Sequence, residues 1–191
     1  MAKLYFKYGA MGSSKTANAL ITKFNYEERG MRVWLIKPAL DVRDGADTVR
    51  SRIGLSADAD ALSKETDIYK AFRDGRDDHV IIADECQFFT AEQIDQLRRI
   101  VDEFDVPVLC FGLRTDFLTH LFEGSRRLFE VADSIAEIKT VCECGSKAIV
   151  NARIDGEGRV VTEGAQLLLG GNDSYVAMCH RCWKRKIARQ E

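Results

Sequence analysis

The stretch that decides the fold is residues 9–16, which read Gly9-Ala10-Met11-Gly12-Ser13-Ser14-Lys15-Thr16. A short apolar segment, Lys3–Tyr8, precedes it, and Lys15–Arg29 follows with apolar residues at helical spacing (Ala17, Leu20, Ile21, Phe24). This pattern predicts a strand, a loop and a helix in that order. The loop resembles the phosphate-binding sequence G-x-x-x-x-G-K-[ST], whose backbone N–H groups surround phosphate oxygens at a helix N-terminus.

Three positions of this loop bear most directly on its chemistry. Lys15 is placed to reach the β- and γ-phosphates of ATP, and the hydroxyl of Thr16 to ligate Mg²⁺. Ser14 stands where the phosphate-loop pattern has its second glycine. We expect the segment to bind nucleotide phosphates rather than to form an ordinary strand–helix turn.

A second nucleotide-site element is Val80–Phe89, VIIADECQFF. Its apolar run Val80–Ala83 predicts a short buried strand that ends at Asp84 and Glu85. An acid at the end of such a strand typically holds Mg²⁺ beside a phosphate loop, so Asp84 is the metal-side candidate. Glu85 then lies near the γ-phosphate, where a carboxylate can accept the proton of an attacking hydroxyl or water.

Strand-like and helix-like segments alternate over residues 1–140. Met31–Ile36 and the run from Pro107 to Gly112 predict further strands, and Asp67–Arg73 and Ala91–Phe104 predict further helices. The alternation predicts an α/β fold, a parallel P-loop sheet flanked by helices, with ligands beyond the carboxyl ends of the strands. We therefore expect residues 1–140 to form a nucleotide-binding domain.

The sequence changes character after residue 140. Asp155–Gly158 lies between the strand-like segments Lys147–Ile154 and Arg159–Thr162, which predicts a β-hairpin. A glycine-rich segment, Glu163–Tyr175, follows, and a basic helix is predicted from His180 onward. We expect residues 141–191 to form a small β-rich lobe, and for the basic helix a solvated face is favoured over nucleic-acid binding.

Four of the six cysteines come as two close pairs, Cys142-x-Cys144 and Cys179-x-x-Cys182. Four thiolates suit tetrahedral Zn²⁺ with no open position, so a structural zinc site in the lobe is favoured over free thiols. Cys86 and Cys110 stand alone in apolar runs and are expected to be small buried hydrophobic residues.

Composition limits the class of protein. The 191 residues include 28 Lys and Arg against 30 Asp and Glu, a formal net charge of −2. That balance is not typical of proteins that coat nucleic acid or an anionic membrane. Apolar runs are too short to cross a bilayer, and the N-terminus lacks the apolar stretch of a signal peptide. We expect a cytoplasmic protein with no membrane or nucleic-acid partner.

The chain resembles the cellular-type (type II) thymidine kinases over nearly its full length, because it has several short sequence motifs of that family in the family's order. They are GAMGSSKT, KPALDVR, RIGLS, DECQFF, FGLRTDF, GGNDSY and the two cysteine pairs, of which the first departs from the family's C-x-x-C by one residue. The resemblance implies ATP-dependent phosphorylation of the 5′-hydroxyl of thymidine, and also of deoxyuridine, in pyrimidine deoxynucleotide salvage. It further implies Mg²⁺ as a cofactor, a homotetramer and feedback inhibition by dTTP.

The same resemblance assigns roles to individual residues. Glu85 matches the family's catalytic base, and Arg153 matches a basic residue near the active site. Beside the phosphate loop, the residues that match the ATP side are Asp41, Arg43, Asp84 and Gln87. The residues that match the thymidine side are Met11, Phe88, Phe117, Gln166, Leu167, Leu168, Leu169, Gly170 and Tyr175, of which 166–170 belong to the loop that covers the substrate.

Two other hypotheses stay open at this point. A small P-loop ATPase could use the zinc lobe to bind nucleic acid, since Asp84–Gln87, DECQ, resembles the acidic motif of helicases. A nucleotide sensor without catalytic activity is the other, since Ser14 departs from the phosphate-loop pattern.

Overall fold

A six-stranded sheet forms the centre of the protein. The computed structural model describes residues 1–41, 45, 47–166 and 175–190. The strand order is β5-β2-β6-β7-β1-β8, and every pairing in the sheet is parallel. The predicted α/β class with a parallel sheet is therefore confirmed.

Ten strands and six helical segments are described. The strands are β1 (Leu4–Tyr8), β2 (Val33–Pro38), β3 (Thr48–Arg50), β4 (Ser56–Asp58), β5 (Asp60–Leu62), β6 (Val80–Ala83), β7 (Val108–Gly112), β8 (Ser134–Glu137), β9 (Val150–Arg153) and β10 (Tyr175–Met178). The helices are α1 (Lys15–Glu27), α2 (Ile68–Gly75), the 3-10 helix η1 (Cys86–Phe88), α3 (Ala91–Phe104), α4 (Glu123–Val131) and α5 (His180–Ala188).

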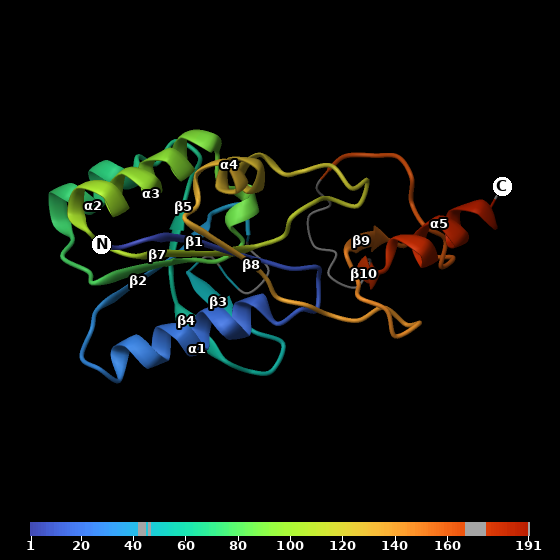
Figure 1. Ribbon diagram of the computed structural model, residues 1–191, viewed down its shortest axis with the longest axis horizontal. Coiled ribbons are helices and arrows are strands. Elements are labelled where there is room, and N and C mark those ends of the chain that lie inside the picture. Colours follow the sequence, from blue (N-terminus) through green and yellow to red (C-terminus); the bar gives the residue numbers. More distant parts are fainter. Residues whose placement is uncertain (42–44, 46, 167–174, 191) are drawn as a thin grey trace.

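Helices cover both faces of the sheet, as Figure 1 shows: α2, α3 and α4 lie on one face, and α1 with the β3–β4 pair lies on the other. Successive residues of a strand point to opposite faces. In β6, Ile81 packs into the core under α2–α4, whereas Val80 and Ile82 pack into the core under α1. A strand buried on both faces reads as a continuous apolar run, which is why β6 was predictable.

Helix α3 has the predicted bounds because its start is specified locally. The hydroxyl of Thr90 accepts the N–H of Gln93, and the Gln93 side chain accepts the N–H of Thr90. This capping box satisfies N–H groups that have no partner within the helix. Ile94, Leu97 and Val101 then fill the core beneath α3, as the helical spacing predicts.

The predicted buried face of α1 is wrong in part. Ala17 and Leu20 are buried, but Ile21 and Phe24 are 47% and 58% exposed. The helix lies on the sheet through Ala17, Ala19 and Leu20, which leaves Ile21 and Phe24 on the outer flank.

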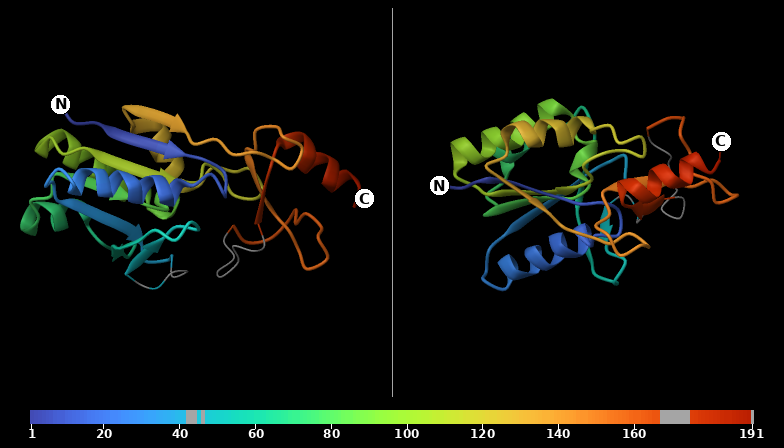
Figure 2. Two further views of the ribbon diagram at one scale, coloured as in Figure 1. Left: turned by 90° about the horizontal axis from the view of Figure 1, so that it is seen from below. Right: turned by 45° about the vertical axis from the view of Figure 1, so that its right-hand side comes forward.

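The C-terminal segment forms a separate small lobe, which extends beyond the carboxyl ends of the sheet strands (Figure 2). Its own apolar core includes Val150, Val160 and Trp183. The predicted hairpin forms as a short antiparallel contact, with the bridge Ile154–Val160 and a hydrogen bond from the N–H of Val161 to the carbonyl of Arg153 at 2.9 Å. The partner with which β9 forms a regular ladder is β10, which was not predicted. None of the described helices combines the length and the apolar composition that a membrane-spanning segment needs.

Candidate active site and thiolate cluster

The phosphate loop begins where β1 ends and crosses close to two backbone segments. The N–H of Gly9 donates to the carbonyl of Gly112, 3.2 Å away, at the end of β7. A Cβ atom on Gly9 would lie 2.4 Å from the carbonyl oxygen of Ile138 and 2.4 Å from the Oγ of Ser13. Only glycine fits there, which explains the first glycine of the loop pattern in physical terms.

Ser14 adopts the left-handed conformation, with φ 62° and ψ 30°, immediately before α1. Its side chain makes no capping hydrogen bond with the helix. The loop therefore has the backbone shape that glycine would adopt without strain, in spite of the departure in sequence. Gly12, with φ 73°, supplies the other left-handed residue of the loop.

Two polar groups of the loop point to a phosphate ligand. The ammonium of Lys15 donates to the carbonyl of Ala10 across the loop, at 3.0 Å, and its side chain is buried. The hydroxyl of Ser13 is also buried, and no hydrogen-bond partner for it lies among the described residues. A buried hydroxyl normally has a partner, and a bound phosphate oxygen would provide one.

The acidic pair lies beside the phosphate loop, where Thr16 and Lys15 both act to lower the pKa of Asp84. Asp84 follows β6, where its N–H donates to the carbonyl of Ile36 at 3.0 Å, and its carboxylate is hydrogen-bonded to the side chain of Thr16. Burial, followed by the negative charge of Glu85, raises the pKa of Asp84 to about 7, and the bond with Thr16 opposes this rise. A hydroxyl and two carboxylates converge there, which are the oxygen ligands that Mg²⁺ prefers.

Glu85 is held in a constrained position at the end of β6. Its backbone is left-handed, with φ 49°, and its side chain is buried. The amide of Gln87 donates to Oε2 of Glu85, while Oε1 of Gln87 accepts the N–H of Leu113 at 2.9 Å. A side chain on Gly112 would collide with Gln87, since its Cβ would lie 2.6 Å from Oε1. Gln87 thus fixes the orientation of the Glu85 carboxylate against the end of β7.

The predicted segment around Asp41 is described only in part. Asp41 is buried, and its N–H donates to the carbonyl of Pro38 at 3.0 Å. Arg43 lies outside the described residues. Sequence analysis did not identify Lys37, which is fully buried and donates to the carbonyls of Gly45 and Thr48 at 2.8 and 2.9 Å.

Two of the predicted thymidine-side aromatics, Phe117 and Tyr175, lie together around Arg153. The guanidinium of Arg153 lies 3.7 Å from the ring centroid of Phe117 and donates twice to the hydroxyl of Tyr175, at 2.7 and 2.9 Å. Phe117 is buried and Tyr175 half-buried. Phe88 packs edge to face on Phe122, with ring centroids 5.5 Å apart. The structure thus brings Phe117, Tyr175 and Arg153 together, and Phe88 has a different ring neighbour.

Gln166 and Met11 are tied to this region by hydrogen bonds. The amide of Gln166 donates to Oδ2 of Asp116 at 2.9 Å, and the N–H of Met11 donates to Oδ1 of Asn151 at 2.8 Å. Asp116 and Asn151 were not identified from sequence, because a single buried Asp or Asn matches no motif. The predicted residues Leu167, Leu168, Leu169 and Gly170 lie outside the described part of the chain.

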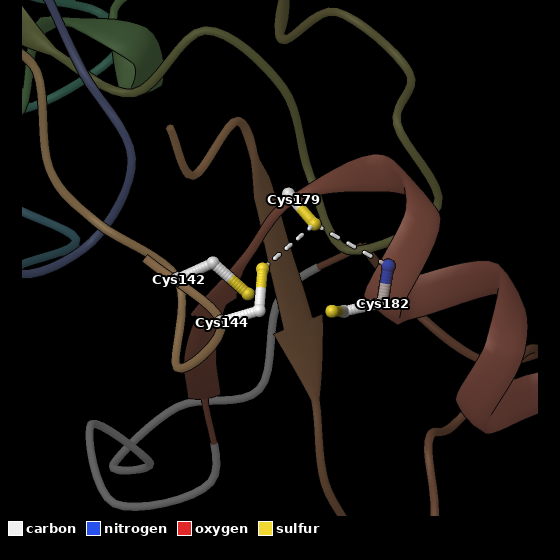
Figure 3. A group of neighbouring side chains, drawn as sticks. All are labelled: Cys142, Cys144, Cys179 and Cys182. Atoms are coloured by element: carbon white, nitrogen blue, oxygen red, sulfur yellow. Dashed lines mark hydrogen bonds between the residues drawn. The ribbon is translucent and has the colours of Figure 1, made fainter. Parts of the chain in front are cut away.

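The four paired cysteines form one cluster, shown in Figure 3. Their Sγ atoms all lie within 4.8 Å of one another, and those of Cys144 and Cys179 are 3.7 Å apart. Thiolates bound about 2.3 Å from a tetrahedral zinc ion lie about 3.8 Å from each other, so the donor set fits zinc. The short C-x-C pair is possible because Gly145 turns with φ 82° and donates to the carbonyl of Cys142 at 2.8 Å.

Hydrogen bonds from neighbouring groups reach the sulfur atoms of the cluster. The Sγ of Cys179 accepts the N–H of Cys182 at 3.4 Å, and Arg185 donates to the Sγ of Cys182 at 3.2 Å. Hydrogen bonds from Ser146 lower the pKa of Cys144 to about 6. Against the bond from Arg185, the neighbouring Cys144 and Cys179 sulfurs raise the pKa of Cys182 to about 11. The other two cysteines, Cys86 and Cys110, are fully buried, which confirms the prediction made for them.

Comparison with known proteins identifies relatives of this chain over nearly its full length. A family model described as thymidine kinase matches residues 2–183. The thymidine kinase of Vibrio cholerae serotype O1 is 45% identical over 192 residues, covering 99% of this chain and 100% of that protein. The thymidine kinase of Enterobacteria phage T4 is 45% identical over 186 residues, covering 96% of each. The Legionella pneumophila ATPase DotB aligns with a TM-score of 0.42 and 16% identity over 76% of this chain and 43% of that chain, a likeness too slight to bear on function.

Proposed function

The chain belongs to the thymidine kinase family, and we propose that Glu85 is the general base with which it transfers the γ-phosphoryl group of ATP to the 5′-hydroxyl of thymidine. The observation that carries this proposal is the hydrogen bond between Thr16 and Asp84. It joins the phosphate loop to the acidic strand end, with Glu85 as the next residue. A nucleoside triphosphate bound to the loop would therefore have its γ-phosphate next to the carboxylate of Glu85.

The residues contribute to phosphoryl transfer in two ways: some neutralise charge on the phosphates and others position the substrates. Lys15 neutralises charge on the β- and γ-phosphates, and the backbone N–H groups of residues 9–16 hold the remaining oxygens. Thr16 and Asp84 would hold Mg²⁺, which supplies charge neutralisation between the two phosphates when bound. Little covalent chemistry is needed from the protein, so alignment of the two substrates sets the rate.

Glu85 is the group that touches the reacting hydroxyl in this proposal. Its carboxylate accepts the proton of the 5′-hydroxyl as the oxygen attacks the γ-phosphorus atom. Gln87 keeps that carboxylate in one orientation through its own bond to the Leu113 N–H. A proton acceptor with a fixed orientation is what general-base catalysis requires, because the transfer depends on geometry before it depends on pKa.

Because a nucleoside is small and neutral, its site needs apolar and aromatic side chains with a few oriented hydrogen bonds. On the family resemblance we assign Phe117, Tyr175 and Phe88 to this side, where Phe117 and Tyr175 both contact Arg153. We assign Met11, Gln166 and the backbone of residues 167–170 to contacts with the thymine ring. This assignment rests on the family resemblance and on the position of Gln166 beside Asp116.

Several finer properties belong to the same proposal. Residues 1–140 form the ATP-binding domain, and residues 141–191 form a zinc lobe that carries the substrate-covering segment. Zn²⁺ is bound by the four clustered cysteines and has a structural role, since four thiolates leave no open position. The family resemblance further supports a cytoplasmic homotetramer that also uses deoxyuridine, is inhibited by dTTP and has no nucleic-acid partner.

The direct test is a coupled assay of ADP release with Mg²⁺ and ATP. Thymidine, deoxyuridine, deoxycytidine, deoxyadenosine and no nucleoside are compared. The proposal requires release that depends on thymidine. Release that needs no nucleoside and rises with single-stranded DNA would identify a nucleic-acid-dependent ATPase, and nucleotide binding without any turnover would identify a sensor.

Glu85→Gln tests the proposed base. We expect turnover to fall by about 10²- to 10⁴-fold, because the amide cannot accept the proton, while ATP binding measured by calorimetry is preserved. Glu92→Gln is the matched control, since Glu92 is an exposed carboxylate in the first turn of α3. Near-normal turnover of Glu85→Gln would remove Glu85 from the mechanism.

A further inference from the structure

The two faces of strand β9 carry different kinds of side chain and contact different parts of the protein. Val150 and Ala152 are buried in the lobe core beside the cysteine cluster. Asn151 and Arg153 are the alternate residues, so their side chains leave the opposite face of the strand. Both are polar and both are buried, with 3% and 6% of their surfaces exposed. Buried polar residues on the face opposite the lobe core indicate a role outside the lobe.

Within the described part of the chain, the side chain of Asn151 makes two hydrogen bonds, and both of them leave the lobe. Its Oδ1 accepts the N–H of Met11 in the phosphate loop at 2.8 Å. Its Nδ2 donates to the carbonyl of Thr115 at 2.9 Å, in the segment between β7 and α4. The side chain of Asn151 thus joins the backbone of the phosphate loop to the backbone just before Asp116 and Phe117.

Arg153, two residues further along β9, continues the same connection. It stacks on Phe117 and donates to the hydroxyl of Tyr175 and to the carbonyl of Gln166, the latter at 3.3 Å. The two side chains of β9 therefore contact the phosphate loop at one end and the aromatic residues of the nucleoside side at the other.

We propose that Asn151 is a positioning residue that holds the phosphate loop at Met11 in register with the nucleoside side, so that the zinc lobe aligns the two substrates. The inference rests on the proposed function, since it concerns the alignment of ATP with a nucleoside. Asn151 acts through backbone groups and touches neither reacting atom. Because phosphoryl transfer depends on alignment, a small displacement of the loop is enough to slow the reaction.

The test compares three variants in the full-length, zinc-loaded protein. Asn151→Ala removes both hydrogen bonds. Asn151→Asp keeps an oxygen that accepts the Met11 N–H and loses the donor to Thr115. Val150→Ala is the control, because it shortens the neighbouring side chain inside the lobe core without touching the phosphate loop. Zinc content and thermal midpoint are measured for each, and Asn151→Leu replaces the alanine variant if that variant does not fold.

Two measurements are made on each variant. Deuterium exchange of the Met11 amide reports the loop bond without any substrate, and steady-state kinetics report the reaction. We expect exchange at Met11 to become at least about tenfold faster in Asn151→Ala and to stay slow in Asn151→Asp and Val150→Ala. We expect kcat to fall by about 10- to 100-fold in Asn151→Ala, with the KM for ATP and for thymidine each changing less than kcat.

The outcomes separate this inference from the proposed function. Met11 exchange in Asn151→Ala that matches the wild type would overturn the inference, whatever the kinetics. Fast exchange with an unchanged kcat would also overturn it, because the loop bond would then not set the alignment. A wild-type protein without thymidine-dependent turnover would refute the proposed function, while the exchange comparison would still decide whether Asn151 holds the loop.

Discussion

The left-handed backbone conformation of Ser14 in the phosphate loop allows the change in stability on substitution by glycine to be predicted. Ser14 has φ 62° and ψ 30°, a conformation that costs an L-amino acid about 1–2 kcal/mol and costs glycine nothing in the folded state. Glycine loses about 0.5–1 kcal/mol more conformational entropy on folding. No capping bond is lost with the serine side chain, which is exposed. Ser14→Gly should therefore stabilise the protein by about 0.5–1 kcal/mol.

For a chain of 191 residues, that gain raises the melting temperature by about 1–4 °C. Scanning calorimetry measures the shift, and Ser14→Ala is a control that removes the hydroxyl but keeps the backbone strain. Gly30→Ala is the reverse control. Gly30 has φ 74°, and a Cβ added there would have no atom within 4 Å, so the alanine should lower the midpoint by a few degrees through backbone strain alone. An unchanged or lower midpoint for Ser14→Gly, with Gly30→Ala destabilised as expected, would refute the strain argument.

Two further predictions concern the metal and pH. Removal of zinc by a chelator should abolish kinase activity and expose the amides of β9 to exchange, because structural zinc contributes on the order of 10 kcal/mol to folding of small domains. Elemental analysis should give one zinc per chain, and full activity of a zinc-free sample would contradict the assignment. Bonds from the Leu4 N–H and then from Arg98 hold the pKa of Asp133 below its usual value of 3.8. Its contribution to stability is therefore present above about pH 5 and is lost as the pH falls below about 4. Urea midpoints of wild type and Asp133→Asn should differ at pH 7 and converge at low pH, and a constant difference would exclude this source of acid sensitivity.

Those parts of the fold whose signals are local could be predicted from sequence. Helix α3 begins at a capping box and repeats its apolar residues at helical spacing, so its bounds followed from neighbouring residues alone. Strand β6 is a continuous apolar run. Helix α4 was missed because its buried face consists of Gly124, Ser125 and Leu128, which do not form an apolar pattern.

Long-range pairing was the main limit in the lobe. The turn at Asp155–Gly158 forms, as Gly158 donates to the carbonyl of Asp155 at 3.1 Å. The predicted return segment then meets β9 only briefly, through the Ile154–Val160 bridge and the bond from the Val161 N–H to the Arg153 carbonyl. What could not be predicted is the ladder of β9 with β10, which lies beyond a long connection and buries Val150 and Met178 beside the cysteine cluster.

The residues of the candidate site also fall into those that sequence motifs indicate and those that they do not. Residues in a motif, such as Lys15, Thr16 and Asp84, were found because spacing along the chain reflects their chemistry. Asn151 and Lys37 were missed because their partners are backbone groups, which any residue possesses. Such partners leave no trace in the sequence of either segment.

The measurement that tests the central claim most directly is ³¹P NMR of the protein with Mg²⁺, ATP and thymidine. The account predicts one new phosphomonoester resonance, coupled to the 5′ protons of the nucleoside, that grows as the γ-phosphate signal of ATP declines. It also predicts that this resonance grows at least about 100-fold more slowly with Glu85→Gln under the same conditions. Growth of inorganic phosphate alone would contradict phosphoryl transfer to thymidine.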